Sequence, residues 1–420
     1  MASPLTDLQA WIDREMADVI SAEPQLPFSR DEYADRLARL RAAMTAAGVD
    51  LVVLTSPDSM GWLHGFSSRV YSWHTSTALP PDAATVVHAE QEPMFYVDSA
   101  FHEALVRKTS CVEDFRPIAE TGVSAYSSLE SFNQHLLGEL KREGWLGGVV
   151  GVERWSGCPP PAAADATRDA LGEAGCRVVD ATGVIRGVRR LKSPAELGYL
   201  EQAQAAVDAG VRRIHERGRA GMSELELWHL YMGGVIEAGG EPSAIHETVA
   251  VGPPEAGLHA LSGDRRIMAG DYFHPDMSAA VHRYHARGTR PFTVGPPRRE
   301  VAALAEVIAG AYHVVLETGR VGMPFGQLNR ALSSYFEQEG FGLDGAFGGG
   351  YELGLSFNPD FVGEFLWGVH MPDDERPIEA GLVTNFESVV FLTMIDTLVF
   401  EESGPRFLSS LPLEVFVIDG

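Results

Sequence analysis

The chain has 420 residues, of which 45% are hydrophobic and 9% aromatic, proportions that are usual for a globular protein. This length predicts two or three domains, and the net charge of −25 opposes binding to nucleic acid or to anionic lipid. The sequence has no run of eighteen apolar residues and no basic start followed by an apolar core. We therefore expect no membrane span, no signal peptide and a cytoplasmic location.

The first half of the chain is predicted to be an α/β layer domain. Residues 1–25 form an expected helical extension, and the capping box Ser29-Arg30-Asp31-Glu32 opens a helix that Gly48 ends. Short apolar runs that indicate strands then alternate with helical segments. The runs are Leu51–Leu54, Ala84–Val87, Met94–Val97, Val149–Val152 and Val178–Val179, and the helical segments are Leu129–Glu143 and Pro161–Ala174. We place this domain at residues 26–186.

The second half mixes long helices with later strands. A second capping box, Ser193-Pro194-Ala195-Glu196, opens an amphipathic helix to about Glu216, and Ser223-Glu224-Leu225-Glu226 opens another. Further helices are expected at about Arg299–Thr318 and Phe325–Glu339. Strands are expected near Thr248–Val251, Tyr272–Met277, Ala280–His285, Pro291–Val294, Leu382–Leu392 and Thr397–Phe400. The domain boundary falls near residues 183–192, so the second domain takes residues 187–420.

One segment carries a resemblance to a known family. The stretch Gly270–Asp276, followed by Tyr284, Arg287, Thr289 and Arg290, resembles the metal-binding strand pair of the creatinase/prolidase/methionine-aminopeptidase superfamily. Four further segments resemble the same family in the same order: Phe28–Leu54, Arg189–Glu196, Val251-Gly252 leading to His259, and Asn385–Ser388. The resemblance covers nearly the whole chain. It implies a creatinase-like N-terminal α/β domain followed by an α+β pita-bread domain.

The residues that would bind metal are incomplete in this chain. The resemblance implies a metal-dependent ligand set of two Asp, one His and two Glu, of which only Asp276 and Glu387 match. Arg287 occupies the position of the family's second Asp ligand, Tyr351 that of the His ligand, and Ile395 that of the last Glu ligand. Because two carboxylates beside a guanidinium do not hold a dinuclear centre, we expect no metal and no other cofactor. An unforeseen metal site built from His274, His282 or His285 is the alternative.

Creatinase is the family member that works without a metal, and the resemblance to it implies the roles of the site residues. His259 would move the proton, because an imidazole titrates near neutral pH. Asp276 and Glu387 would bind or orient the substrate, while Arg287 and Tyr351 would stabilise charge. Arg287 is expected between the two carboxylates, either orienting substrate or merely neutralising them.

Further residues are candidates for substrate binding. The chain carries Thr289 where creatinase has an acidic residue, which disfavours creatine as the substrate. The aromatic, loop-like stretch from Trp62 to His74 supplies four candidates by resemblance to creatinase-like dimers. They are Phe66, Arg69, Tyr71 and His74, and packing in a strand-end loop is the alternative for them. His370 lies in an irregular stretch, 357–377, that forms either a lid or a surface loop.

Three histidines lie around the predicted strand pair. Strand alternation places His282 on the same face as Asp276 and Tyr284, with His285 facing the other way. Surface exposure is the simplest expectation for His274, His282 and His285.

The sequence therefore predicts a metal-independent, creatinase-like enzyme that acts on a small polar nitrogenous metabolite, most simply by C–N bond hydrolysis. One alternative is non-hydrolytic chemistry at the same site, such as elimination or cyclisation. The other is a non-catalytic binding protein with the same fold. The expected partner is a small-molecule substrate, with no nucleic acid and no membrane, and the family resemblance implies a homodimer.

Overall fold

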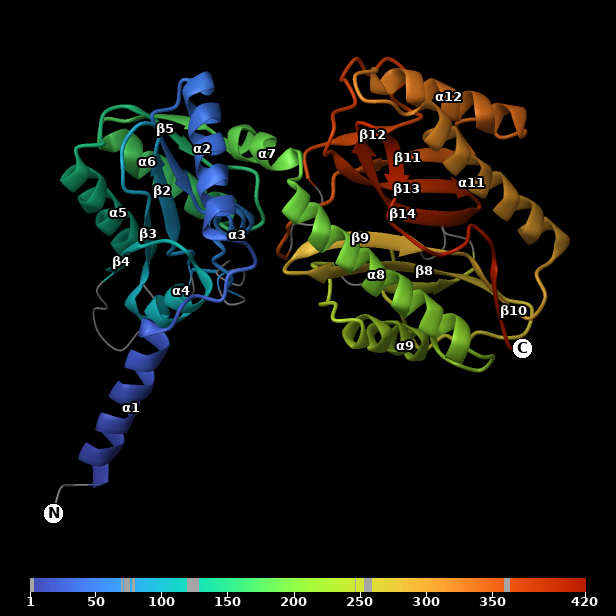
Figure 1. Cartoon of the computed structure of the whole chain (residues 1–420), viewed down its shortest axis with the longest axis horizontal. Helices are drawn as coiled ribbons and strands as arrows, with labels where there is room; N and C mark the ends of the chain where they lie inside the picture. Colours follow the sequence, from blue (N-terminus) through green and yellow to red (C-terminus); the bar gives the residue numbers. More distant parts are fainter. Residues whose placement is uncertain are drawn as a thin grey trace. The chain divides into compact units, whose positions relative to one another are not determined.

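A computed structural model of the chain describes residues 4–68, 71, 76–77, 80–118, 128–245, 247–252, 259–358 and 363–420. The chain divides into two compact units (Figure 1). Unit 1 runs to Arg189 and includes the segment that begins at Phe357, and unit 2 is the rest from Arg190. The expected boundary at residues 186–187 thus lies three residues before this division.

Unit 1 is a six-stranded sheet with helices on both faces. Its strands have the order β4-β3-β2-β1-β5-β6. They are β1 (Leu51–Leu54), β2 (Ala84–His88), β3 (Phe95–Ser99), β4 (Asp114–Ile118), β5 (Val149–Val152) and β6 (Arg177–Asp180). The helices are α1 (Pro4–Ser21), α2 (Arg30–Ala47), α3 (Pro57–His64), α4 (Glu103–Thr109), α5 (Leu129–Glu143), α6 (Pro161–Glu173) and α7 (Thr182–Arg190), with a short 3-10 turn at Ala100–His102.

Alternation along β1 explains why both faces of this sheet are covered. Leu51 and Val53 pack into a core with α5 and α6. Val52 and Leu54 point the other way and pack with α2, α3 and α7. Continuous apolar runs such as β1 are typical of strands buried on both faces.

The aromatic stretch that begins at Trp62 is not wholly a loop, so that expectation needs correction. Helix α3 includes Trp62 and His64, and both side chains are buried. The cause is local: the Ser56 side chain caps the first turn, Pro57 stands at its start, and Gly65 ends the helix with φ of 84°.

Unit 2 contains a ten-stranded sheet. Eight strands follow the order β12-β11-β13-β14-β9-β8-β10-β16, with β15 paired to β14 and β7 to β8. The strands are β7 (Thr248–Val251), β8 (Tyr272–Val281), β9 (Tyr284–Thr289), β10 (Phe292–Val294), β11 (Phe347–Tyr351), β12 (Leu366–Gly368), β13 (Val383–Val390), β14 (Leu392–Glu401), β15 (Gly404–Phe407) and β16 (Phe416–Ile418). The main helices are α8 (Pro194–Arg217), α9 (Glu224–Glu237), α11 (Arg299–Thr318) and α12 (Phe325–Gln338). The helix starts expected at Ser193 and Ser223 are both present, and each has a capping box.

The helices of unit 2 cover one face of each half of its sheet (Figure 1). Phe273 and Met277 of β8 pack into the core with α8 and α9. Phe386 of β13 and Met394 of β14 pack into a second core with α11 and α12. The alternating side chains of these strands point away from the helices. We call this surface the inner face, and it carries Tyr272, His274, Asp276, Arg287, Thr289, Asn385, Glu387 and Ile395.

The hairpin between β8 and β9 reverses the expected side-chain alternation. Its two turn residues, His282 and Arg283, have φ of 47° and 64°, as a tight two-residue turn requires. The resulting register pairs Ala280 with His285 and Val281 with Tyr284. His285 therefore shares the face of Asp276 while Tyr284 does not, so the predicted assignment was wrong.

Helix α11 is, within the described part of the chain, the one helix whose length and apolar composition would suffice to cross a membrane. Its buried residues, which include Ile308, Tyr312 and Val315, belong to the core formed with β13 and β14. Core helices of globular domains often meet this criterion, so its composition alone is weak evidence for a span.

Candidate functional site

Arg287 of β9 lies at the centre of the inner face. Its Nη2 pairs with Asp276 of β8, and its Nη1 lies 3.3 Å from Oε1 of Glu387 on β13. The guanidinium thus lies between the two carboxylates, as expected from the sequence. Thr397 fixes the backbone of Arg287, since its Oγ1 accepts from the Arg287 N–H at 2.9 Å.

Burial sets the electrostatics of this cluster. The side chains of Asp276, Arg287 and Glu387 are 14%, 6% and 15% exposed. Burial opposes the charge of Arg287, but the two carboxylates outweigh it, so the pKa of Arg287 is raised. Burial also raises the pKa of Glu387, although Arg287 partly offsets this rise. The cluster holds two acids and one base, which leaves an excess of negative charge when all three are ionised.

Two neighbours complete the cluster. The guanidinium carbon of Arg287 lies 5.6 Å from the centre of the Tyr351 ring, within the range of a cation–π contact. Asn385 donates from Nδ2 to Oε1 of Glu387 at 2.7 Å and accepts the Tyr351 N–H at 2.7 Å. Asn385 therefore positions both residues. Asn385 was not among the predicted site residues, although its spacing of two from Glu387 places both on one face of a strand.

His259 is exposed, and a positive charge on its ring slightly offsets the rise that burial causes in the pKa of Glu387. This interaction brings His259 into the electrostatic neighbourhood of the cluster. Thr289 lies on the same face of β9 as Arg287 and is fully buried. His370 is exposed and stacks on Phe347, with ring centres 5.9 Å apart.

The residues present do not fit a dinuclear metal centre. Arg287 occupies the space between Asp276 and Glu387, and a positive guanidinium repels a divalent cation. Ile395 pairs directly with Glu387 across β13 and β14, so an apolar side chain stands where a fifth ligand would be needed. The described residues contain no group of three His, Cys, Asp or Glu side chains that could hold a metal.

The three histidines of the hairpin do not gather into a ligand group. His274 and His285 are buried, which corrects the expectation of exposure, whereas His282 is exposed in the turn, as expected. Burial lowers the pKa of His274 to about 4 and that of His285 to about 3. Nε2 of His285 accepts the N–H of Ala244 at 2.9 Å, so this histidine anchors backbone.

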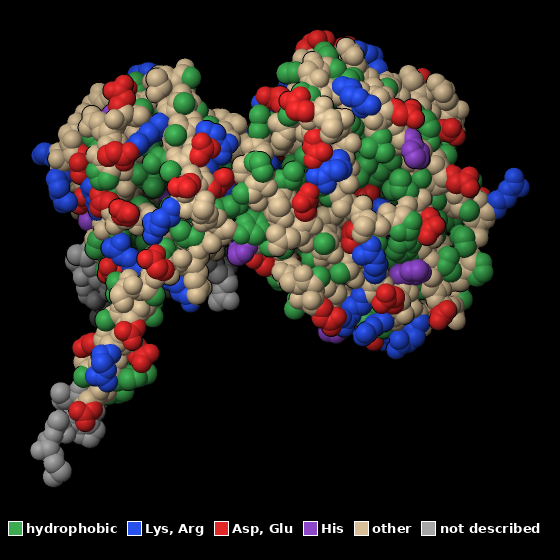
Figure 2. All heavy atoms as spheres, in the orientation of Figure 1, with side chains coloured by type: hydrophobic (Ala, Val, Ile, Leu, Met, Phe, Trp, Pro, Cys, Tyr) green, Lys and Arg blue, Asp and Glu red, His purple; other side chains and the backbone are tan. Residues whose placement is uncertain are grey.

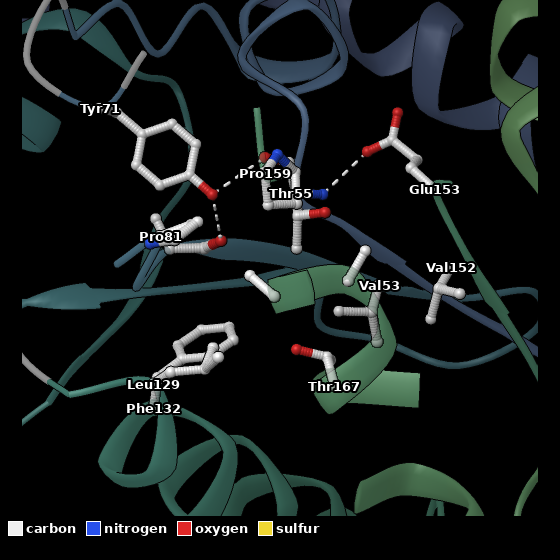
Figure 3. Close-up of a pocket in the computed structure, with 13 residues that line it drawn as sticks. Val53, Thr55, Tyr71, Pro81, Leu129, Phe132, Val152, Glu153, Pro159 and Thr167 are labelled. Atoms are coloured by element: carbon white, nitrogen blue, oxygen red, sulfur yellow. Dashed lines mark hydrogen bonds between the residues drawn. The ribbon is translucent and has the colours of Figure 1, made fainter. Parts of the chain in front are cut away.

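The unit 1 candidates have structural partners. Phe66 and Tyr71 are buried in a core cluster of unit 1, which favours the packing interpretation over substrate contact. Figure 3 shows Tyr71 beside a small pocket, with its hydroxyl donating to the carbonyls of Thr55 at 3.0 Å and Ala83 at 3.1 Å. Glu153 at this pocket accepts the Thr55 N–H. Arg69 and His74 lie outside the described residues.

Two family models match this sequence. The model of the creatinase/prolidase N-terminal domain matches residues 36–191, and that of metallopeptidase family M24 matches residues 198–406. The chain therefore has the two-domain architecture of an N-terminal creatinase-like domain and a C-terminal pita-bread domain, which confirms the predicted fold class. It belongs to the creatinase/prolidase superfamily, a family of hydrolases.

Individual relatives agree with this assignment. The chain is 26% identical to the ectoine hydrolase of Halomonas elongata, over 93% of this chain and 98% of the relative. It is 25% identical to a probable dipeptidase PepE of Mycobacterium tuberculosis, over 93% and 98%. The crystal structure of a dipeptidase from Pyrococcus horikoshii superposes with a TM-score of 0.75 at 19% identity, covering 91% of this chain and all of the other.

Proposed function

We propose that the chain is a hydrolase that opens an amide or amidine C–N bond of a small polar metabolite without a metal ion. The observation that carries this proposal is Arg287, ion-paired to both carboxylates that a metal would need. The similarity to an ectoine hydrolase supports the choice of bond, because ectoine is a small cyclic amidine. The metal-free chemistry then has to come from proton transfer and fixed charges.

In the proposed reaction a water molecule attacks the carbon of the scissile C–N bond. His259 takes a proton from that water, because an imidazole can both accept and donate a proton near neutral pH. The same proton then passes to the leaving nitrogen as the C–N bond breaks, so one water is added and no redox partner is needed. Arg287 and Tyr351 stabilise the charge that develops in between.

The first experiment measures turnover and metal content together. Protein purified without a chelating tag or column is incubated with ectoine, creatine and glycyl-proline, and products are followed by proton NMR. We expect hydrolysis of ectoine by protein that carries substoichiometric metal in plasma mass spectrometry, with no loss of rate in a chelator. Dipeptide cleavage that requires added Mn²⁺ or Zn²⁺, or tightly bound stoichiometric metal, would overturn the proposal.

The role of His259 has its own test. His259→Ala is expected to lower kcat for ectoine by roughly 10²- to 10⁴-fold, the usual contribution of a general acid–base group, with ectoine binding changed only a few-fold. The matched control is His313→Ala, which removes an exposed histidine from α11 and should leave kcat unchanged. If His259→Ala weakens binding and no turnover is found in either protein, the non-catalytic alternative takes precedence.

The homodimer and the cytoplasmic location stay predictions. Light scattering of the purified protein would test the homodimer.

A further inference from the structure

His274 is a buried histidine of the inner face that the proposed reaction does not use. It lies on β8, two residues before Asp276, and is 1% exposed. Phe273, next to it, packs into the core with α8 and α9, so His274 points to the same side as Asp276. An imidazole is therefore buried on the face that carries the ion-paired cluster.

The hydrogen bond of His274 fixes which nitrogen carries the proton. Nδ1 lies 3.2 Å from the carbonyl oxygen of Gly252. A carbonyl oxygen only accepts, so Nδ1 must be the donor. Because no acidic side chain among the described residues forms an ion pair with this buried ring, the imidazole is neutral, and Nε2 presents a lone pair.

Nε2 of His274 has no hydrogen-bond partner within the described part of the chain. Both ring nitrogens of the buried His64, by comparison, have partners, Ser110 and Thr85, at 2.7 Å each. Nε2 of His285 accepts a backbone N–H. A buried acceptor without a partner is costly and calls for an explanation, such as a ligand that completes it.

We infer that Nε2 of His274 accepts a hydrogen bond from an N–H group of the substrate and thereby helps to determine specificity. This inference rests on the proposed function and narrows the substrate to compounds with a nitrogen-bound hydrogen. The adjoining cluster favours the same chemistry, because two carboxylates and one guanidinium leave an excess of negative charge beside the histidine. An amidinium or ammonium N–H suits both the acceptor at Nε2 and the negative charge of the cluster. A carboxylate or carbonyl oxygen does not, because it can only accept and would face the lone pair of Nε2.

The tautomer can be tested without any substrate. Two-bond ¹H–¹⁵N spectra of histidine-labelled protein distinguish the Nδ1–H and Nε2–H forms, and His274→Asn identifies the signal. We expect the Nδ1–H form in the free protein at neutral pH. An Nε2–H form or an imidazolium would overturn the inference, whatever the enzyme does with ectoine.

Two substitutions separate the role of Nδ1, which donates to Gly252, from that of Nε2, the proposed acceptor. His274→Asn keeps an N–H near the position of Nδ1, where it can still donate to Gly252, but removes the atom at Nε2. His274→Gln places an amide oxygen near the position of Nε2. With ectoine as the probe, His274→Asn should raise Kd about tenfold, the usual effect of leaving one buried donor unpaired, and His274→Gln should recover most of the loss.

A structural role gives a different pattern. The control His64→Asn, in unit 1, should lower the melting temperature while leaving the Kd of ectoine unchanged. If His274→Asn lowers only the melting temperature, or if ectoine leaves the ¹⁵Nε2 shift of His274 unmoved, His274 does not bind substrate. If ectoine does not bind at all, the amidine assignment falls, while the product assay with creatine and the dipeptide still decides whether the chain hydrolyses C–N bonds.

Discussion

At the scale of single residues, Arg287 supplies a positive charge between two carboxylates, Asp276 and Glu387. Its two Nη atoms donate to Asp276 and Glu387, which lie on different strands. The planar guanidinium of an arginine fixes the directions of its donors, whereas the ammonium of a lysine acts as a point charge and binds two carboxylates less specifically. The two carboxylates are held close together on the inner face, so the ionised state of both depends on this guanidinium. Arg287 therefore contributes to stability as well as to the proposed chemistry.

Removing that guanidinium should destabilise the protein in a pH-dependent way. Arg287→Met leaves two neighbouring buried carboxylates unpaired, and the expected loss in free energy of unfolding at pH 8 is about 3–5 kcal/mol. Burial already raises the pKa of Glu387, and without Arg287 to offset this rise its folded-state pKa lies further above the unfolded value. The variant then regains stability as the pH falls towards 5, because the folded state binds more protons. Urea unfolding at pH 8 and pH 5 measures the difference.

Arg287→Lys is the matched control for this prediction. It retains one positive charge, so its loss at pH 8 should be smaller than that of Arg287→Met, and less dependent on pH. An equal loss for Arg287→Met at both pH values would show that the side chain acts through packing and not through its charge.

At the scale of elements, local signals in the sequence were sufficient to predict where helices begin, but not which side chains lie on the inner face. The helix starts at Ser193 and Ser223 were predicted because a capping box is made by four consecutive residues. The hairpin turn His282-Arg283 lacks the usual Asn-Gly signal, so the reversal of alternation that it causes could not be read from the sequence.

The glycine-rich segment Phe347–Tyr351 shows the same limit. No strand was expected there, but the structure makes it strand β11. A Cβ on Gly350 would collide with the Asn385 carbonyl, and one on Gly349 with that of Trp367. These glycines permit close approach of backbones that are distant in sequence, which no local pattern reveals. The ion pairs of Arg287, by contrast, were anticipated because the family resemblance aligned all three residues.

The two capping boxes of unit 2 allow a matched comparison. Glu196 caps the start of α8 and also accepts from the buried hydroxyl of Tyr284 on β9, at 2.8 Å. Glu226 makes the same capping bond at the start of α9 but is exposed. Loss of the cap should cost about 1 kcal/mol in either case.

Glu196→Ala should therefore destabilise unit 2 by about 1–3 kcal/mol more than Glu226→Ala, since it also leaves a buried tyrosine hydroxyl without this acceptor. Glu196→Gln, which keeps an oxygen acceptor, should recover part of the difference. Chemical denaturation of the three variants measures these values. Equal losses for the two alanine variants would mean that the bond from Tyr284 to Glu196 adds nothing to stability.

At the scale of the whole molecule, the acids and bases behind the charge of −25 are spread along the sequence. Figure 2 shows acidic and basic side chains interspersed over both units on the face drawn. Buried titratable groups contribute to the pH dependence of stability, because their pKa values differ between the folded and the unfolded state. Three buried histidines have such an effect, His64 in unit 1 and His274 and His285 in unit 2.

Burial lowers the pKa of His64 to about 3, far below the value of about 6.5 expected in an unfolded chain. Between these values the unfolded state binds a proton that the folded state does not, so stability is fully present above pH 6.5 and is lost as the pH falls. Each such histidine changes the free energy of unfolding by up to about 1.4 kcal/mol per pH unit in this range.

His64→Gln should accordingly reduce the acid sensitivity of the protein while lowering its stability at neutral pH. Its hydrogen bonds to Ser110 and Thr85 are disturbed, yet the free energy of unfolding should decline between pH 6.5 and pH 4.5 by about 1.4 kcal/mol per unit less than in the parent. His313→Gln, at an exposed position, should leave the slope of the parent unchanged. Urea titrations at half-unit pH steps give both slopes, and a parallel decline in His64→Gln and parent would show that His64 does not govern acid unfolding. Because His64 lies in unit 1, the change should appear in the unfolding of that unit, leaving the histidine-dependent slope of unit 2 as it was.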